Sequence, residues 1–241
     1  RFSLFPFLPG VPPPAGSLAQ RRIDGRLLAR FTSDMARSPL EEQRDGFGRL
    51  WELDLFVQAA GDESFNGLLR RFGVEYPVFA SAVRRQRYVN LRELSRLGYG
   101  ELTPVLVHGD FQRENLRFVE GELTALLDFD SVRLDAAVVD LACSVWLDCL
   151  KPPAYDAINV RAASALAEGY VGLRTLSAQE TALVPALIRA HMLVFVALRL
   201  MQWASGSKQA VVSIARTVER RFPALEAASG PLLEALVPIE R

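Results

Sequence analysis

The sequence predicts a mainly helical α+β fold in which one small β segment interrupts a helical body. Apolar residues recur at helical spacing over most of the 241 residues, whereas between about residues 102 and 127 the pattern becomes that of short strands. Half of the residues are hydrophobic and 23% are charged, a composition typical of a soluble globular chain. The length suits one large domain or two small ones.

Apolar periodicity and the breakers between segments define the helices. Ser177, with Glu180 three residues later, forms a capping-box pattern before the longest of them. The predicted helices cover approximately residues 17–35, 46–60, 63–72, 76–97, 137–150, 156–171, 178–204, 208–221 and 223–237.

The β segment is predicted to contain three short strands. The first is Leu102–Val107, and the other two, Leu116–Val119 and Glu122–Leu127, flank a tight Glu120-Gly121 turn. Residues 1–16, RFSLFPFLPGVPPPAG, indicate the end of a strand leaving through an extended linker, so we expect a hinge-like segment 1–16 followed by a helical domain 17–241.

Charge and cysteine content exclude several classes of protein. Lys plus Arg and Asp plus Glu each number 28, so the basic surface expected of a nucleic-acid binder is absent, and a membrane-surface protein is disfavoured. The apolar run from Thr181 to Leu200 contains charged residues, which favours a buried helix over a membrane span. Cys143 and Cys149 fit neither a zinc motif nor a disulfide framework, and no signal-peptide pattern opens the chain; we therefore expect reduced thiols in a cytoplasmic protein.

The residues that indicate chemistry lie between positions 107 and 140. His108-Gly109-Asp110 closes a strand, Asn115 follows Asp110 by five positions, and Asp128 follows across the predicted hairpin. Phosphoryl transfer from ATP requires a carboxylate that orients the acceptor hydroxyl and oxygen ligands that hold Mg²⁺ against the phosphates. The five-residue interval is that of the protein-kinase catalytic loop, and the later Asp occupies the place of the metal-binding Asp.

This segment resembles the aminoglycoside phosphotransferase and choline kinase-like small-molecule kinases, which share the protein-kinase fold. The resemblance rests on HGDFQREN, the hairpin, LLDFDS and Asp140-Leu141-Ala142; its specific part is residues 105–142. It extends over the chain as the C-terminal, large lobe of that fold. Within the family, LFPFLPG and the long helical tail are similar to the homoserine-kinase-like branch.

The resemblance implies a role for each residue of the motif. Asp110 would be the catalytic carboxylate, and His108 would brace its loop by hydrogen bonding. Asn115 and Asp128 would be the Mg²⁺ ligands, with Asp130 as a further carboxylate near the metal.

The resemblance also implies how the nucleotide is held. The LFPFLPG segment would be the hinge, with the backbone near Phe5 and Phe7 at the adenine edge, and Arg117 and Leu127 would lie at the base. Arg117 stands where the family usually has an apolar residue, so its stem would cover the adenine or its guanidinium would stack on it.

The helix after the hairpin carries the remaining candidates. Asp140 would tie that helix to the catalytic loop, although a helix N-cap is an equally good interpretation. Trp146 and Asp148 would line the acceptor pocket, with core packing as the alternative for the tryptophan. His191, on an apolar helical face, is expected to be a core histidine.

The sequence departs from the family pattern in its lysines. A kinase of this fold needs a strand lysine on the phosphates before the hinge, but the only lysines, Lys151 and Lys208, follow the catalytic loop, and no Gly-x-Gly-x-x-Gly loop occurs. Either the chain is the C-terminal part of a longer kinase or the natural protein lost its small lobe. The missing initiator methionine favours the first explanation.

We therefore expect ATP- and Mg²⁺-dependent transfer of the γ-phosphoryl group to a hydroxyl of a small metabolite. A non-catalytic binding or scaffolding module is the alternative, and the oligomeric state stays open. Residues 151–241 hold ten Lys/Arg against seven carboxylates, which favours an amino alcohol, amino acid or sugar over a polycationic aminoglycoside as acceptor.

Overall fold

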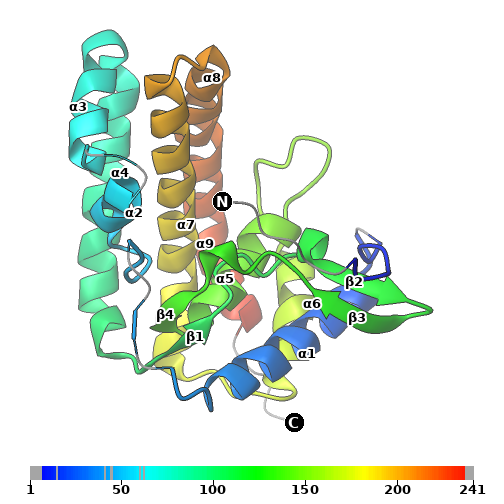
Figure 1. The fold of residues 1–241 in the computed structure, drawn as a ribbon. Coiled ribbons are helices and arrows are strands. Elements are labelled where there is room, and N and C mark those ends of the chain that lie inside the picture. Colours follow the sequence, from blue (N-terminus) through cyan, green and yellow to red (C-terminus); the bar gives the residue numbers. More distant parts are fainter. Residues whose placement is uncertain are drawn as a thin grey trace.

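The computed structural model describes residues 7–14, 16–40, 42–43, 46–59, 61 and 63–236. In this part of the chain helices dominate, and two small antiparallel sheets lie among them (Figure 1). The α+β, mainly helical prediction is confirmed. The helices are α1 Leu18–Met35, α2 Leu53–Ala59, α3 Phe65–Glu75, α4 Pro77–Arg96, α5 Val138–Asp148, α6 Val160–Val171, α7 Ala178–Ala204, α8 Lys208–Arg216 and α9 Phe222–Leu236.

Helix α7 forms the centre of the molecule and contacts α2, α3, α4, α5, α8 and α9. It begins with the predicted capping box, in which Ser177 Oγ accepts from the Glu180 N–H and the Glu180 carboxylate accepts from the Ser177 N–H. Within the described ranges, α7 is the one helix long and apolar enough to cross a membrane, and 78% of its apolar stretch is buried inside the fold.

The predicted helix over residues 46–60 is wrong in its first half, because only Leu53–Ala59 is helical. The preceding residues instead use their polar groups in tertiary hydrogen bonds. The Arg49 guanidinium donates to the carbonyls of Tyr99 and Leu102, and the Leu50 N–H donates to the Asp135 carboxylate at 2.9 Å. A second difference is that α8 and α9 are joined by a π-helical segment, Thr217–Arg221, rather than separated.

The two sheets lie on either side of the candidate catalytic loop. Strand β2 (Leu116–Val119) pairs with β3 (Glu122–Leu126) as predicted, and positive φ angles at Glu120 and Gly121, 50° and 85°, form the tight turn. Strand β1 (Pro104–Val107) pairs with β4 (Arg133–Ala136), which the sequence pattern did not predict. The β1–β4 pairing brings the chain after the hairpin back beside the start of the loop.

Candidate active site

One face of α5 holds the loop between β1 and β2, which contains the candidate catalytic residues. Asp140, Ser144 and Asp148 occur at four-residue intervals and therefore share that face. Their contacts run along the loop: the Asp140 carboxylate accepts from the N–H groups of residues 108 and 109 at 2.8 and 2.7 Å, Ser144 Oγ donates to the carbonyl of residue 111 at 2.6 Å, and Asp148 accepts from the N–H of residue 113 at 2.8 Å.

The two carboxylates of α5 are deeply buried, which affects their ionisation. Burial raises the pKa of Asp140, although the two loop N–H groups and nearby positive charges oppose the rise. Burial also raises the pKa of Asp148 to about 6, against the opposing effect of the Arg21 guanidinium, which lies 3.6 Å away, and of the loop N–H. These groups position the loop, because their oxygens are occupied by its backbone.

Gly109 is required by the shape of the loop. Its φ is +79°, in the left-handed region, and a Cβ at this position would lie 2.3 Å from the Ser131 carbonyl oxygen and 2.5 Å from Arg133 Nη1. The backbone of the loop is therefore packed directly against the segment that leads into β4.

His108 joins the loop to the end of the hairpin. Its ring is fully buried, Nδ1 accepts from the Asp110 N–H at 3.3 Å, and Nε2 lies 3.0 Å from the Leu127 carbonyl oxygen. With Nδ1 accepting, the ring proton that faces the Leu127 carbonyl lies on Nε2. The bracing geometry expected of His108 is present.

Asp110 and Asn115 lie together, as their spacing predicted. The Asn115 amide nitrogen donates to the Asp110 backbone carbonyl at 2.9 Å and to its carboxylate at 3.0 Å, and the Gln112 amide donates to both carboxylate oxygens at 2.9 Å. The Asp110 side chain is thus fixed by two amides, while the carbonyl oxygen of the Asn115 amide is left as a potential cation ligand.

Asp128 follows the second strand of the hairpin and lies at the same end of the hairpin as the loop, because β2 and β3 are antiparallel and Leu116 pairs with Leu126. The Leu127 N–H donates to the Asn115 carbonyl at 2.8 Å, which places the residue before Asp128 against Asn115. Asp128 is exposed and has a left-handed backbone with φ 63° and ψ 68°. Asp130, two residues on, is also exposed.

The donor types, rather than a preformed cage, determine which metal these residues could hold. Across the described part of the chain, no three His, Cys, Asp or Glu side chains form a metal-binding group. An amide oxygen and a carboxylate are nevertheless the hard ligands that Mg²⁺ takes when nucleotide phosphates and water complete its octahedron. Asn115 and Asp128 therefore fit a cation that arrives with a nucleotide.

The structure describes only some of the residues that were expected to bind the nucleotide. Phe5 lies outside the described residues, and Phe7 is 91% exposed. The segment after it runs along the hairpin, since Val11 pairs with Phe118 through two backbone hydrogen bonds. The Arg117 guanidinium donates to the carbonyls of residues 114 and 116, so it is folded onto its own loop.

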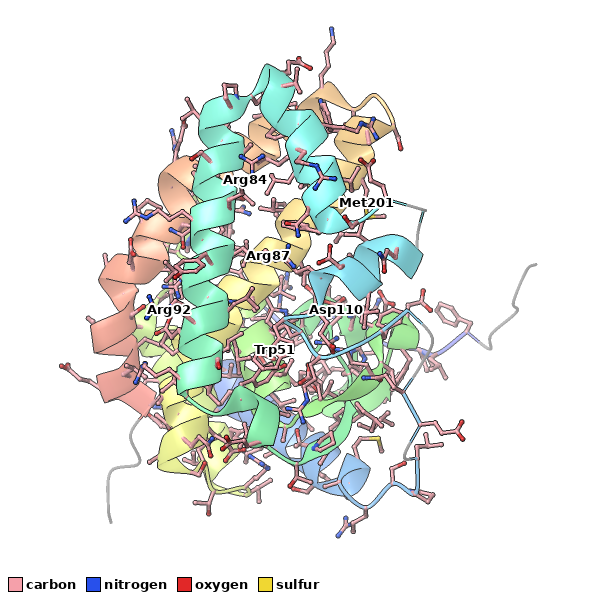
Figure 2. All side chains as sticks on the ribbon, turned by 90° about the vertical axis from the view of Figure 1, so that its left-hand side faces the viewer. Trp51, Arg84, Arg87, Arg92, Asp110 and Met201 are labelled. Carbon is pink, nitrogen blue, oxygen red and sulfur yellow. The ribbon has the colours of Figure 1, made fainter. Side chains whose placement is uncertain are left out.

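Trp146 and Asp148 were expected to line the acceptor pocket, but neither lines the cavity of about 70 Å³ that lies against Gly109. Both belong to α5, whose inner face points into the core and toward the loop. Trp146 is 5% exposed, with Arg221 stacked 5.3 Å from its ring centroid, and the Asp148 side chain is 9% exposed beneath the loop. Figure 2 views the molecule from the side of α3 and α4, and Asp110 is labelled below α2 in this view.

Sequence reasoning missed two residues at this site, Ser144 and Arg133. Ser144 follows Asp140 by four positions, so the two share a helix face and Ser144 could have been predicted from Asp140. Arg133 reaches the loop only through the β1–β4 pairing, for which the sequence carries no clear strand signal.

Comparison with known proteins identifies the family. Residues 1–176 match the model of the phosphotransferase enzyme family. A homoserine kinase of Chelativorans sp. (strain BNC1) is 29% identical over 192 residues, covering 78% of this chain and 53% of that protein. The chain thus spans about half the length of this relative.

Two solved structures share the fold at low sequence identity. The amicoumacin kinase hAmiN, in complex with AMP-PNP, Ca²⁺ and Ami, superposes with a TM-score of 0.60 at 15% identity, covering 88% of this chain and 60% of that one. A microcompartment-associated aminopropanol kinase gives a TM-score of 0.59 at 18% identity, covering 91% and 65%. On the family match and this shared fold, the chain belongs to the phosphotransferase enzyme family.

Proposed function

We propose that this chain carries the catalytic loop of a small-molecule kinase that transfers the γ-phosphoryl group of ATP to a hydroxyl. The observation that carries the proposal is the arrangement of Asp110, which two amide side chains hold on a loop that α5 anchors along its length. The relatives and neighbours are named as a homoserine kinase, an amicoumacin kinase and an aminopropanol kinase, and the amicoumacin kinase was solved with AMP-PNP and Ca²⁺.

In this proposal Asp110 accepts a hydrogen bond from the acceptor hydroxyl and aims its oxygen at the phosphorus. The amides of Gln112 and Asn115 keep the carboxylate in one rotamer. Asn115 and Asp128, with Asp130 nearby, would hold Mg²⁺, which when bound neutralises charge on the phosphates. The segment near Phe7, together with Arg117 and Leu127, would lie on the nucleotide side, and the chain as a whole would be the large lobe of the kinase fold.

A cytoplasmic location accompanies the proposal. Both cysteines, Cys143 and Cys149, are free and buried, and burial raises both thiol pKa values. Such thiols are inert and typical of proteins from reducing compartments.

Turnover and binding of one variant test the proposal. Asp110→Asn should lower kcat at least about 1,000-fold, because the residue acts on the reacting hydroxyl, while the affinity for Mg²⁺-ATP changes less than about threefold. A coupled ADP-release assay and isothermal titration calorimetry give the two quantities, measured on this chain and on the full-length gene product.

Asp34→Asn is the matched control, since Asp34 is an exposed carboxylate on α1 outside the loop. It should leave both quantities unchanged. Unaltered turnover in Asp110→Asn would remove Asp110 from the reaction, and nucleotide binding without turnover on any hydroxyl acceptor would instead support a non-catalytic binding module.

A further inference from the structure

An arginine cluster surrounds one carboxylate where the loop between α5 and α6 meets the π-helical segment that joins α8 to α9. Asp156, in the loop, accepts from Arg216 Nε at 2.6 Å and from Arg221 Nε at 3.4 Å. Arg220 Nη1 lies 3.6 Å from the other carboxylate oxygen of Asp156. Arg220 and Arg221 belong to the π-helical segment, a rare conformation that occurs frequently at functional sites.

Aromatic rings hold the Arg221 guanidinium in place, while two of its nitrogens stay accessible. The guanidinium lies 5.3 Å from the Trp146 ring centroid and 5.4 Å from that of Phe195, and the Arg199 guanidinium lies over the same Phe195 ring at 4.5 Å. Nη1 and Nη2 of Arg221 donate to no residue in the described ranges, and unlike Arg199 Nε they are not buried. The side chain is 15% exposed, so these two donors can be reached by a small ligand.

One carboxylate leaves most of the positive charge of this cluster uncompensated. Asp156 is the only acidic partner of the four arginines in the described part of the chain, and the exposed Glu219 nearby in sequence pairs with none of them. The single hydrogen bond of Arg199 and the second one of Arg216 go to a neutral amide and a backbone carbonyl. Burial, together with the Arg216 and Arg199 charges, lowers the pKa of Arg221. A second anion would offset this repulsion.

The arrangement matches a phosphate group better than a carboxylate. A guanidinium presents two parallel N–H donors to an oxyanion, and the two accessible nitrogens of Arg221 form such a pair. A phosphate monoester carries about 1.5 to 2 negative charges at pH 7 and three acceptor oxygens, whereas a carboxylate carries one charge. Because most of the Arg221 side chain is enclosed, a small group fits this site better than an extended surface such as a membrane.

We propose that Arg221, assisted by Arg220 and Arg199, binds the phosphate group of a small phosphorylated metabolite. None of these arginines belongs to the catalytic loop, so the site is additional to the candidate active site. It adjoins the support of that loop, because Trp146 lies on α5, whose neighbouring residues hold the loop backbone. The proposal does not depend on phosphoryl transfer by this protein.

Isothermal titration calorimetry of inorganic phosphate into the full-length gene product tests the site. Titrations with and without saturating Mg²⁺ and AMP-PNP separate this site from the nucleotide site, and potassium chloride keeps the ionic strength constant. Phosphate should bind at least about 10-fold more tightly than acetate in both conditions, the difference expected of one further hydrogen bond to a charged group.

Arg221→Met should weaken phosphate binding at least about 10-fold. Arg220→Met should weaken it about threefold, because the Arg220 side chain is 67% exposed and contributes mainly charge. Arg71→Met is the matched control, since Arg71 also lies over a tryptophan, Trp203 at 5.8 Å, and pairs with one carboxylate, Glu63 at 2.5 Å. It should leave the phosphate affinity unchanged.

No phosphate binding, equal binding of phosphate and acetate, or phosphate binding that AMP-PNP abolishes would overturn the site, whether or not the variants fold. An unchanged phosphate affinity in Arg221→Met, with a circular dichroism spectrum like that of the wild type, would also overturn it. If Arg221→Met does not fold, undiminished affinity in Arg220→Met has the same consequence. None of these results involves turnover, so failure of the site is distinct from failure of the kinase proposal.

Discussion

The backbone of Gly109 determines how the catalytic loop lies against the rest of the molecule. Two glycines with positive φ, Gly109 before Asp110 and Gly121 in the turn of the hairpin, differ in their surroundings. A Cβ on Gly109 would strike a carbonyl and a guanidinium, whereas a Cβ on Gly121, with φ +85°, would meet nothing within 4 Å. A side chain would therefore force a strained backbone at either position, but only at position 109 would its Cβ also overlap other atoms.

Gly121→Ala should lower the free energy of unfolding by about 1 kcal/mol, and Gly109→Ala should lower it by at least about 2 kcal/mol more. Urea denaturation of the two variants measures the difference. Equal losses of stability would contradict the close packing described for the loop.

Asp148 makes the stability of the fold depend on pH. Because its folded pKa of about 6 lies above the ordinary 3.8, the folded protein binds this proton more tightly than the unfolded chain does. Its contribution to the free energy of unfolding therefore falls as the pH rises from about 4 to about 6 and stays constant above that range.

Asp148→Asn removes this titration while keeping an acceptor for the loop N–H. The stability of the variant relative to wild type should rise by up to about 3 kcal/mol between pH 4 and pH 6. Urea unfolding at a series of pH values tests this prediction. Parallel pH profiles for the two proteins would show that Asp148 does not titrate in this window.

Residue spacing predicted part of the site. Asp110 and Asn115 belong to one short loop, so their meeting follows from local geometry, and a hairpin with a Glu-Gly turn predicted the return of the chain toward Asp128. Arg133 was not predictable in this way, because its place beside Gly109 depends on pairing between strands that lie almost thirty residues apart.

Among the elements, α5 and α7 show how secondary structure supports the site. Helix α5 holds the loop through hydrogen bonds, and α7 packs against α5 (Figure 1). Two residues of α7, His191 and Val194, also line the cavity against Gly109. Helix α7 is itself stabilised at its N-terminus, where the capping box satisfies N–H groups that the first turn leaves unpaired.

Ser177→Ala should lower the free energy of unfolding by about 1 kcal/mol, the usual cost of losing an N-cap side chain. Ser213→Ala, in the interior of α8, should change it by less than about 0.5 kcal/mol, because Ser213 Oγ only donates to the Gln209 carbonyl one turn earlier, at 3.2 Å. Thermal or urea unfolding compares the two, and equal effects would argue against the cap.

The elements also show where sequence patterns fail. Long helices such as α1, α4 and α7 were predicted closely. One apolar face determines α1 and α4, whereas α7 is a long apolar run that begins with a capping box and is buried on most sides. Strand β4 was not, since two of its four residues, Arg133 and Asp135, are buried charged side chains that break the alternating pattern. The irregular stretch before α2 was taken for helix, because its apolar spacing did not reveal that Arg49 and Leu50 bind other parts of the chain.

At the scale of the whole molecule, the loop lies next to two features of the fold. The segment around Val11 pairs with the β2–β3 hairpin, and residues between 47 and 56 line a cavity against Gly109 together with α7. In the proposed kinase these would be the nucleotide side and the acceptor side. The family match over residues 1–176 contains the loop, both sheets and the whole of α6, and it ends just before α7.

Phosphorus-31 NMR tests the central claim most directly, because it follows the γ-phosphoryl group itself. In a mixture of the full-length gene product, ATP, Mg²⁺ and L-homoserine, a phosphate-monoester resonance should grow as the γ-phosphate resonance of ATP declines, and Asp110→Asn should abolish that growth. Appearance of inorganic phosphate alone, or a phosphate monoester formed equally well by Asp110→Asn, would contradict the account.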